Sequence, residues 1–210
     1  MNFSSVSGKN WQFNKFKSSD VSYYSENFSL SEIVAKLLSI RKKNIGDINL
    51  FLDPKIKNLL PNPLILKDMK KAVDRVYNCI QNNDYIGIFG DYDVDGAAST
   101  ALLARYFLSL NIKTNTYIPD RQKEGYGPNK LGFQSLINKN SKIIFTVDCG
   151  TSSYESINYA QKNGIDVIVL DHHQSDTNLP KAHAIVNPNR YDDTSNLNYL
   201  CATGVCFVFL

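Results

Sequence analysis

Apolar and polar residues change their spacing near residue 85, and this change predicts two parts of the chain with different architectures. Before it, apolar residues recur at helical spacing over about residues 31–43 and again after Asp68, which is placed to cap the second helix. A shorter helical segment is predicted over 47–60. Residues 1–29 show no sustained period, so we predict an extended or poorly ordered leader there.

From residue 85 onward, short apolar runs alternate with helical segments of about ten residues or more. This alternation is typical of a parallel α/β sheet with helices on both faces. Strands are predicted at 85–90, 113–118, 142–147, 166–170 and 184–187, and helices at 97–110, 129–138 and 152–163. We therefore expect a short helical N-terminal region over residues 1–75, followed by an α/β domain over residues 76–210.

Composition supports a folded globular protein. Hydrophobic residues make up 43% of the 210 residues and charged residues 20%, which excludes a disordered or purely polar chain. No apolar stretch reaches the roughly 18 residues that cross a bilayer, and the N-terminus lacks the features of a signal peptide. The four cysteines form no C-x-x-C pair, so neither a disulfide scaffold nor a zinc knuckle is expected. We expect a cytoplasmic protein that does not associate with membranes.

The net charge of +3 is divided unevenly along the chain. Residues 1–75 carry a net charge of +6, and residues 76–210 carry −3. The first part includes Lys67, Lys70, Lys71 and Arg75, which can attract a polyanion. The acids of the second part are clustered, so their positions are informative.

Acidic and imidazole side chains follow three of the predicted strands. The first strand leads into Asp91-Tyr92-Asp93-Val94-Asp95-Gly96, the third into Asp148-Cys149-Gly150, and the fourth into Asp171-His172-His173. In open parallel sheets, ligands bind beyond the carboxyl ends of the strands, so we expect these groups at one edge of the sheet. Carboxylates packed so closely would repel one another unless cations neutralised them.

Two divalent cations would neutralise this cluster. Carboxylate oxygens with one or two imidazoles suit Mn²⁺ or Mg²⁺ better than the thiolate-rich sites that zinc often uses. A pair of such ions about 4 Å apart can activate water and hold a phosphate for in-line attack. The sequence therefore predicts phosphoester hydrolysis. The adjacent His172 and His173 point in different directions, so one can bind a metal while the other faces the phosphate, whereas His183 is expected to be structural.

The pattern D-x-D-x-D-G also opens calcium loops of the EF-hand kind. Such a loop requires a glutamate at its twelfth position, where this chain has Leu102, and it lies between two helices. A calcium loop is therefore not expected. Gly96 instead allows a tight turn into a helix that we predict to begin near Ala97.

The three motifs, in this order and spacing, resemble the DHH phosphoesterase superfamily and, within it, the RecJ-type single-strand-specific DNA exonucleases. The resemblance runs from about Leu37 to the end and includes Ile118-Pro119-Asp120-Arg121, Glu124-Gly125-Tyr126-Gly127 and Val186-Asn187-Pro188. It implies that the metal ligands are Asp91, Asp93, Asp95, Asp148 and His172. It also implies that Asp148 and His173 are catalytic, with His173 contacting the scissile phosphate or the attacking water. Asp171 would orient the neighbouring histidines.

The same resemblance implies substrate contacts and a biological role. Arg121 would bind a phosphate, with a solvated loop arginine as the alternative, and Tyr126 would either stack on a base or simply pack. The substrate would be single-stranded DNA, degraded from 5′ to 3′ in DNA repair and recombination. The family's fourth motif, an aspartate, and its C-terminal nucleic-acid-binding domain would lie beyond Leu210, because Asp192 and Asp193 come too early. We therefore expect an N-terminal fragment that by itself binds metal weakly and has little activity.

Two alternative functions stay open at this point. One is a DHH phosphodiesterase that acts on short oligonucleotides or cyclic dinucleotides. Pyrophosphatases of the superfamily carry a histidine where this chain has Phe89, which argues against pyrophosphate as the substrate. The other alternative is an inactive fragment that only binds metal or nucleic acid. The basic residues before residue 76 favour the DNA exonuclease over the phosphodiesterase that acts on small substrates.

Overall fold

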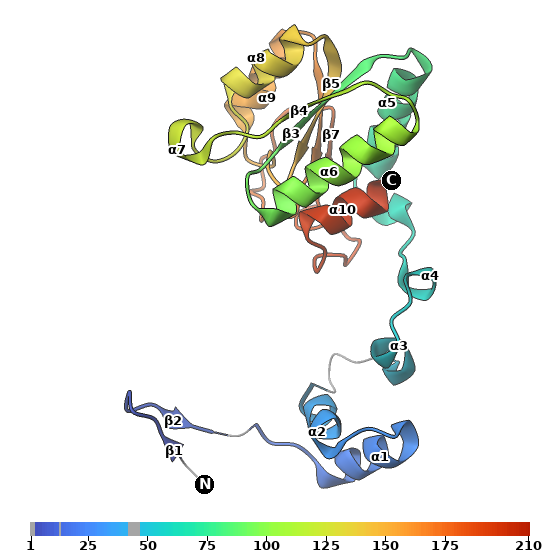
Figure 1. Cartoon of the computed structure of the whole chain (residues 1–210), viewed down its shortest axis with the longest axis vertical. Helices are drawn as coiled ribbons and strands as arrows, with labels where there is room; N and C mark the ends of the chain where they lie inside the picture. Colours follow the sequence, from blue (N-terminus) through green and yellow to red (C-terminus); the bar gives the residue numbers. More distant parts are fainter. Residues whose placement is uncertain (1–2, 13, 42–46) are drawn as a thin grey trace. The chain divides into compact units, whose positions relative to one another are not determined.

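The computed structural model describes residues 3–12, 14–41 and 47–210, which belong to two compact units, Met1–Leu60 and Pro61–Leu210 (Figure 1). The described residues of the first unit form two short antiparallel strands followed by four helices: β1 (Phe3–Ser4), β2 (Asn10–Trp11), α1 (Ser18–Phe28), α2 (Glu32–Arg41), α3 (Ile48–Leu52) and α4 (Ile56–Leu59). Helices α1 and α2 pack together through Val21, Tyr24, Ala35 and Leu38.

The first unit differs from the sequence-based expectation in two places. The predicted leader contains α1, whose buried side chains, Val21 and Tyr24, are too few to produce a clear helical period. The segment predicted over 47–60 is two short helices, α3 and α4, with Pro54 between them, because proline disfavours the helical conformation in the residue before it. The basic end predicted for α2, at Lys42 and Lys43, lies outside the described residues.

The second unit is a mixed α/β domain built on five parallel strands. Its elements in chain order are η2 (Pro63–Ile65), α5 (Met69–Gln81), β3 (Tyr85–Gly90), α6 (Val94–Ser109), β4 (Thr114–Tyr117), α7 (Arg121–Glu124), α8 (Lys130–Asn138), β5 (Ser141–Val147), α9 (Tyr154–Lys162), β6 (Asp166–Leu170), β7 (Ala184–Val186) and α10 (Ala202–Phe209). The strands lie in the order β4-β3-β5-β6-β7, and every neighbouring pair is parallel. The predicted fold class and the position of all five strands are confirmed.

The strand order makes the sheet doubly wound, because the chain moves from β3 outward to β4 on one side and then returns to build β5, β6 and β7 on the other. Helices α5, α6 and α10 share one hydrophobic core with the sheet, and α8 and α9 share the core on its other face. In sheets of this kind, ligands bind at the carboxyl edge where the winding reverses. Here that position lies between the ends of β3 and β5.

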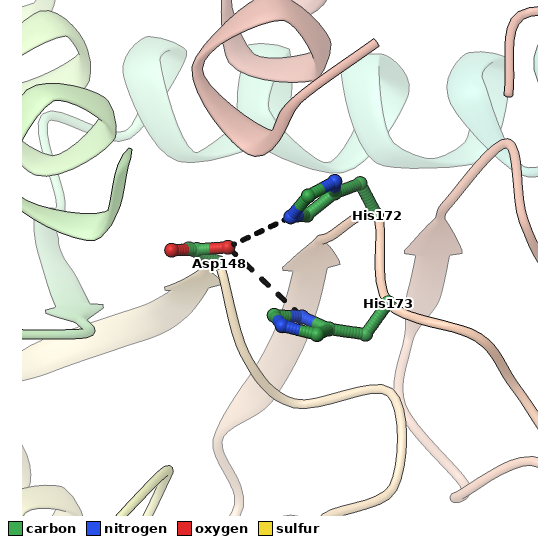
Figure 2. A group of neighbouring side chains, drawn as sticks. All are labelled: Asp148, His172 and His173. Atoms are coloured by element: carbon green, nitrogen blue, oxygen red, sulfur yellow. Dashed lines mark ion pairs between the residues drawn. The ribbon is translucent and has the colours of Figure 1, made fainter. Parts of the chain in front are cut away.

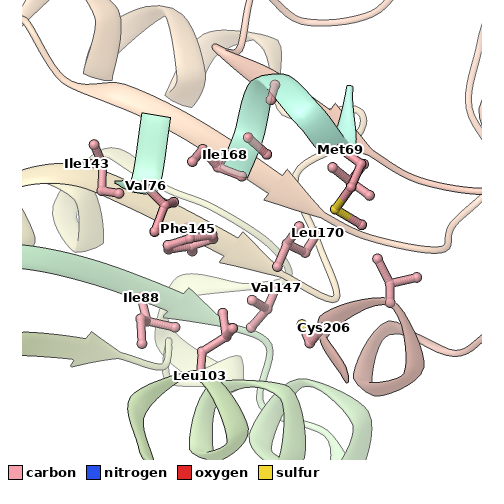
Figure 3. Packing of buried hydrophobic residues seen from close by; sticks show 14 of the residues in the cluster. Met69, Val76, Ile88, Leu103, Ile143, Phe145, Val147, Ile168, Leu170 and Cys206 are labelled. Atoms are coloured by element: carbon pink, nitrogen blue, oxygen red, sulfur yellow. The ribbon is translucent and has the colours of Figure 1, made fainter. Parts of the chain in front are cut away.

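Buried aliphatic and aromatic side chains hold the helices on the sheet. Figure 3 shows Met69 of α5, Leu103 of α6 and Cys206 of α10 gathered around side chains of the central strands, such as Phe145 and Leu170. All five are fully buried. The strands have continuous apolar runs because both of their faces are covered, which is typical of parallel sheets. This packing fixes the ends of β3, β5 and β6 relative to one another.

The boundary expected between residues 75 and 76 falls inside α5, whereas the compact units divide between Leu60 and Pro61. Helix α5 belongs to the second unit because its apolar face is part of the sheet's core. The sequence suggested that the Asp68 side chain caps α5, but in the structure it makes no capping hydrogen bond to this helix. Its carboxylate instead accepts hydrogen bonds from the Ile185 N–H at 3.1 Å and from Arg190 Nη1 at 2.8 Å, which ties α5 to β7. Among the described residues, no helix is long and apolar enough to span a bilayer.

Candidate metal centre

The first acidic motif connects β3 to α6 at the carboxyl edge of the sheet. Asp91 directly follows the strand and is buried. Asp93 is the N-cap of α6, and its carboxylate accepts the Gly96 N–H at 3.0 Å, so the helix begins at Val94 and not near Ala97 as predicted. A Cβ on Gly96 would lie 2.5 Å from the Asp91 carbonyl oxygen. Glycine at this position therefore lets the first turn of α6 lie against the end of the strand.

Asp148 occupies the centre of the site in a constrained conformation. It follows β5 with a φ of 59°, in the left-handed region that few residues other than glycine adopt, and its side chain is 2% exposed. Burial and the neighbouring Asp93 carboxyl group raise its pKa to about 8. Its Oδ1 atom, like Oδ1 of Asp91, is buried without a hydrogen-bond partner among the described residues. Burial also raises the pKa of Asp91.

Two groups of side chains bring ligand atoms within 4.8 Å of one another, and Asp148 belongs to both. One group joins it to Asp91 and Asp93, and the other joins it to His172 and His173. Figure 2 shows both histidines, from the loop after β6, turned toward Asp148 at the end of β5; His172 Nε2 lies 3.3 Å from Asp148 Oδ1. A carboxylate shared by two ligand groups is suited to bridging two ions.

The donor chemistry of these two groups fits divalent cations. Carboxylate oxygens and neutral imidazole nitrogens are ligands for Mn²⁺ and Mg²⁺. Two buried carboxylate oxygens that have no hydrogen-bond partner among the described residues are costly in a metal-free protein, and bound cations would satisfy both. The residues present therefore fit two adjacent ions. The individual ligand roles stay predictions.

Asp171 faces the histidines from the inside of the loop. Its Oδ1 accepts hydrogen bonds from the His172 N–H at 2.7 Å, the His173 N–H at 3.2 Å and His173 Nδ1 at 2.7 Å, and its Oδ2 accepts the Thr151 N–H at 3.1 Å. Burial alone would raise its pKa, yet these hydrogen bonds hold it below the usual value. The bond to Asp171 raises the pKa of His173 to about 9. Asp171 thus orients His173 and is not in either ligand group.

Asp95 has a different position from the other acids of the first motif. Its carboxylate accepts the N–H groups of Ala202 and Thr203, both at 2.8 Å, and also the Thr203 hydroxyl. Burial would raise the pKa of Asp95, but these hydrogen bonds lower it. Asp95 Oδ2 is 3.7 Å from His172 Nε2. In this structure Asp95 therefore caps α10 and is not part of either ligand group.

The two residues expected to contact substrate lie at the rim of the site. The Arg121 guanidinium lies 4.9 Å from the centre of the Tyr92 ring, and its positive charge acts to lower the pKa of Asp91. The Tyr126 hydroxyl donates to the Asp148 carbonyl oxygen at 3.3 Å and lies 3.4 Å from His173 Nε2. A cavity of about 390 Å³ opens beside Tyr126 and His173. Tyr126 therefore lines this cavity together with His173, whereas Arg121 lies beside Tyr92 of the first acidic motif.

Three of the four basic residues that the sequence singled out before residue 76 form ion pairs. Lys70 Nζ lies 2.6 Å from an Asp74 carboxylate oxygen, and Arg75 Nε lies 2.6 Å from Asp166 Oδ2. Lys67 is 3.6 Å from Asp192. These ion pairs reduce the positive charge that Lys67, Lys70 and Arg75 offer to a polyanion, so these three residues are weak support for nucleic-acid binding. His183 also lies near Asp166, at the amino end of β6 and away from the acids.

Some residues that shape the site carry no local signal of their role in the sequence. Ala202 and Thr203 bind the Asp95 carboxylate. Because they lie more than a hundred positions after Asp95, no local sequence pattern predicts this contact. Asn187, by contrast, follows β7, so the rule that identified Asp148 and Asp171 after their strands applies to it as well. Its side chain contacts the loop that carries the histidines.

The fold and the site together define a doubly wound α/β protein with a candidate two-metal centre at the carboxyl edge of its sheet. Residues 85–210 match the model of the DHH family, N-terminal domain, and the chain belongs to this family. It is 35% identical over 94% of its length to the single-stranded-DNA-specific exonuclease RecJ of Bacillus subtilis, and 36% identical over 76% of its length to that of Escherichia coli. It spans about a quarter of these relatives, 25% and 28% of their lengths.

Solved structures agree with this placement. A crystal structure of exonuclease RecJ bound to manganese is 30% identical and matches with a TM-score of 0.62, covering 69% of this chain and 36% of that one. The structure of RecJ from Thermus thermophilus in complex with Mn²⁺ matches over 94% of this chain and 27% of that one, with a TM-score of 0.71. At 22% identity, the second comparison supports the fold alone.

Proposed function

We propose that this chain is the metal-binding portion of a single-strand-specific DNA exonuclease, which hydrolyses phosphodiester bonds with two Mn²⁺ or Mg²⁺ ions. The single observation that carries the proposal is Asp148, shared by two adjacent ligand groups. The names of the relatives support the substrate, and the manganese-bound relative supports the metal. A 5′ to 3′ direction, a role in DNA repair and a cytoplasmic location are parts of the same proposal.

In this proposal, Asp91, Asp93, Asp148 and His172 hold the ions. When bound, divalent ions would lower the pKa of bound water and stabilise the negative charge of a phosphate. Asp148 brings the two ligand groups together, because its buried carboxylate faces Asp93 on one side and His172 on the other.

His173 supplies a proton donor beside the ions. Its Nδ1 is fixed by Asp171, so its Nε2 is directed toward Tyr126 and the adjacent cavity. The raised pKa keeps the ring protonated near neutral pH, which allows Nε2 to donate a hydrogen bond to a phosphate oxygen or a proton to the leaving oxygen. Arg121 adds a positive charge at the rim, where a neighbouring phosphate would lie.

A titration of the chain with Mn²⁺ tests the metal centre directly. We expect two ions to bind per chain, measured by calorimetry or by electron paramagnetic resonance, with spin coupling between them. Asp148→Ala should remove the coupling, because the shared ligand is lost. A single uncoupled ion in the unaltered chain would contradict a two-metal centre.

A nuclease assay tests the substrate. With Mn²⁺ in excess, the full-length exonuclease of which we propose this chain is the metal-binding portion should release labelled mononucleotides from 5′-labelled single-stranded DNA and not from the matched duplex. Undiminished hydrolysis by Asp148→Ala would remove Asp148 from the site. Hydrolysis of a cyclic dinucleotide without attack on single-stranded DNA would support the alternative phosphodiesterase. Metal binding without any hydrolysis would support a binding module.

A further inference from the structure

Asn187 is a buried amide that lies directly behind the two histidines of the site. It follows β7, is fully buried, and uses all of its side-chain hydrogen-bonding groups. Its Nδ2 donates to the His173 carbonyl oxygen and to the Thr151 hydroxyl, both at 2.9 Å. Its Oδ1 accepts the Asn189 N–H at 2.8 Å, and the Asn189 amide in turn donates to the His172 carbonyl oxygen. Removing a buried amide of this kind would leave its hydrogen-bond partners unsatisfied, which is costly.

These contacts complete the fixation of the histidine pair. Asp171 accepts both backbone N–H groups of His172 and His173, and the two asparagines bind both of their carbonyl groups. Every backbone hydrogen-bonding group of the pair therefore has a partner. The polypeptide segment that carries both imidazoles is held on two sides.

Asn187 also connects the histidine loop to the loop that carries Asp148. Its second donor bond ends on Thr151, and the Thr151 N–H donates to Asp171. Asp171 in turn holds His173, so the four residues form a closed ring of hydrogen bonds between the ends of β5, β6 and β7. This ring fixes the separation of the two loops that carry His172 and Asp148. Between these loops, His172 Nε2 lies 3.3 Å from Asp148 Oδ1 (Figure 2).

We propose that Asn187 is a positioning residue, which sets the distance between the histidines and Asp148 and so prepares the site for two ions. That this positioning prepares a metal site rests on the proposed metal-dependent function. The positioning itself is a property of the metal-free chain. Residues that support metal ligands in this way typically change metal affinity about 10- to 100-fold when they are replaced. The hydrogen bonds of the Asn187 side chain involve Thr151, the His173 carbonyl oxygen and the Asn189 N–H, so it would act through the loop that carries the histidines.

The first test follows the Asp171 bond to His173 in the metal-free chain. The proton on His173 Nδ1 is hydrogen-bonded to Asp171 and half-buried, so we expect a distinct downfield imidazole N–H signal in the proton NMR spectrum. Loss of this signal in His173→Gln would assign it. Asn187→Ala should broaden or remove this signal while the circular dichroism spectrum stays unchanged. A folded Asn187→Ala chain with an unchanged signal would overturn the proposal.

Asn115→Ala is the matched control. Asn115 donates from Nδ2 to the Lys139 carbonyl oxygen at 3.1 Å and to the Ser141 hydroxyl at 3.3 Å, at the amino end of β5. It thus bridges a carbonyl and a hydroxyl as Asn187 does, but at the opposite edge of the same sheet. This variant should leave the His173 signal in place. If Asn187→Ala does not fold, Thr151→Val can replace it, because it removes one hydrogen bond of the ring with little change in volume. Thr151→Val should weaken the same signal, and an unchanged signal would again overturn the proposal.

The second test measures Mn²⁺ affinity of the full chain by calorimetry. Asn187→Ala should weaken binding about 10-fold or more, and Asn115→Ala should leave it within about twofold of the unaltered chain. Equal affinities in a folded Asn187→Ala variant would overturn the positioning role. Failure of the unaltered chain to bind Mn²⁺ would instead refute the proposed function, and the imidazole signal would still decide the role of Asn187.

Discussion

Replacing Asp148 by asparagine should stabilise the metal-free chain while it removes the metal centre. Asparagine keeps the shape of the side chain and tolerates the left-handed conformation that Asp148 adopts at a φ of 59°. It removes the negative charge that is buried next to Asp93. The substitution therefore separates the function of Asp148 from its cost to folding.

The magnitude follows from the pKa of Asp148. An ordinary aspartate has a pKa of 3.8, and burial raises that of Asp148 to about 8, so at pH 7 folding requires the uptake of one proton. The difference between 3.8 and 7 corresponds to at most about 4 kcal/mol at 1.36 kcal/mol for each pH unit. Asp93 is exposed beside it, so solvent screens part of this effect. We expect Asp148→Asn to raise the free energy of unfolding at pH 7 by about 2 kcal/mol.

The sign of the pH dependence distinguishes this cause from a general change in packing. A raised pKa in the folded state makes the ionised carboxyl group increasingly unfavourable from pH 3.8 up to about 8, so the gain from Asp148→Asn should grow over that range and then stay constant. Asp171→Asn is the matched control, because hydrogen bonds lower the pKa of Asp171. That variant should lose stability at neutral pH and approach the unaltered chain as the pH falls.

Urea unfolding followed by circular dichroism, without metal and between pH 3.5 and 9, measures both variants. Addition of Mn²⁺ at about 100 times its dissociation constant should stabilise only the unaltered chain, by about 2.7 kcal/mol, and so reverse the order of stability at pH 7. A pH-independent effect of Asp148→Asn, or a loss of stability at pH 8, would refute the electrostatic explanation.

Three further outcomes are expected. Gly132→Ala would place a methyl group 2.4 Å from the Phe89 ring and should lower the free energy of unfolding by about 1 to 3 kcal/mol in urea titrations, whereas Gly204→Ala, which meets only a side chain at 3.3 Å, should change it little. Thr203→Val removes the hydroxyl hydrogen bonds to Asp95 and should cost about 1 to 2 kcal/mol by the same measurement; an unchanged midpoint would show that α10 does not depend on them. Binding of Mg²⁺ at pH 7 should release about one proton, detected by calorimetry in buffers of different ionisation enthalpy, and this release should diminish as the pH rises through 8. Release that is independent of pH would contradict a protonated buried acid in the metal-free site.

Much of the second unit could be predicted from the sequence, because its signals are local. Each strand is a short apolar run between helical segments, and the observed bounds of β3 and β6 are those that were predicted. The first unit was less predictable. Helix α1 buries few apolar side chains and therefore leaves a weak periodic signal.

The candidate site was predictable only where a residue's position after a strand determines its surroundings. Asp91, Asp148 and the His172-His173 pair follow parallel strands, whose carboxyl ends meet at one edge of a sheet. Asp95 illustrates the limit of this argument. It lies in the same motif as Asp91, but its carboxylate caps α10, which follows more than a hundred positions later in the chain.

Local spacing along the chain was enough to establish the alternation of strands and helices and the set of acids and histidines at one edge of the sheet. Which carboxylates face one another, and which accept hydrogen bonds from distant segments, became known from the folded arrangement alone. Asp148, Asp171 and Asp95 carry the same carboxyl group, yet burial raises the pKa of the first while hydrogen bonds lower the pKa of the other two. The three acids differ because a buried carboxylate takes its properties from its neighbours in space, and the packing of the helices on the sheet chooses those neighbours.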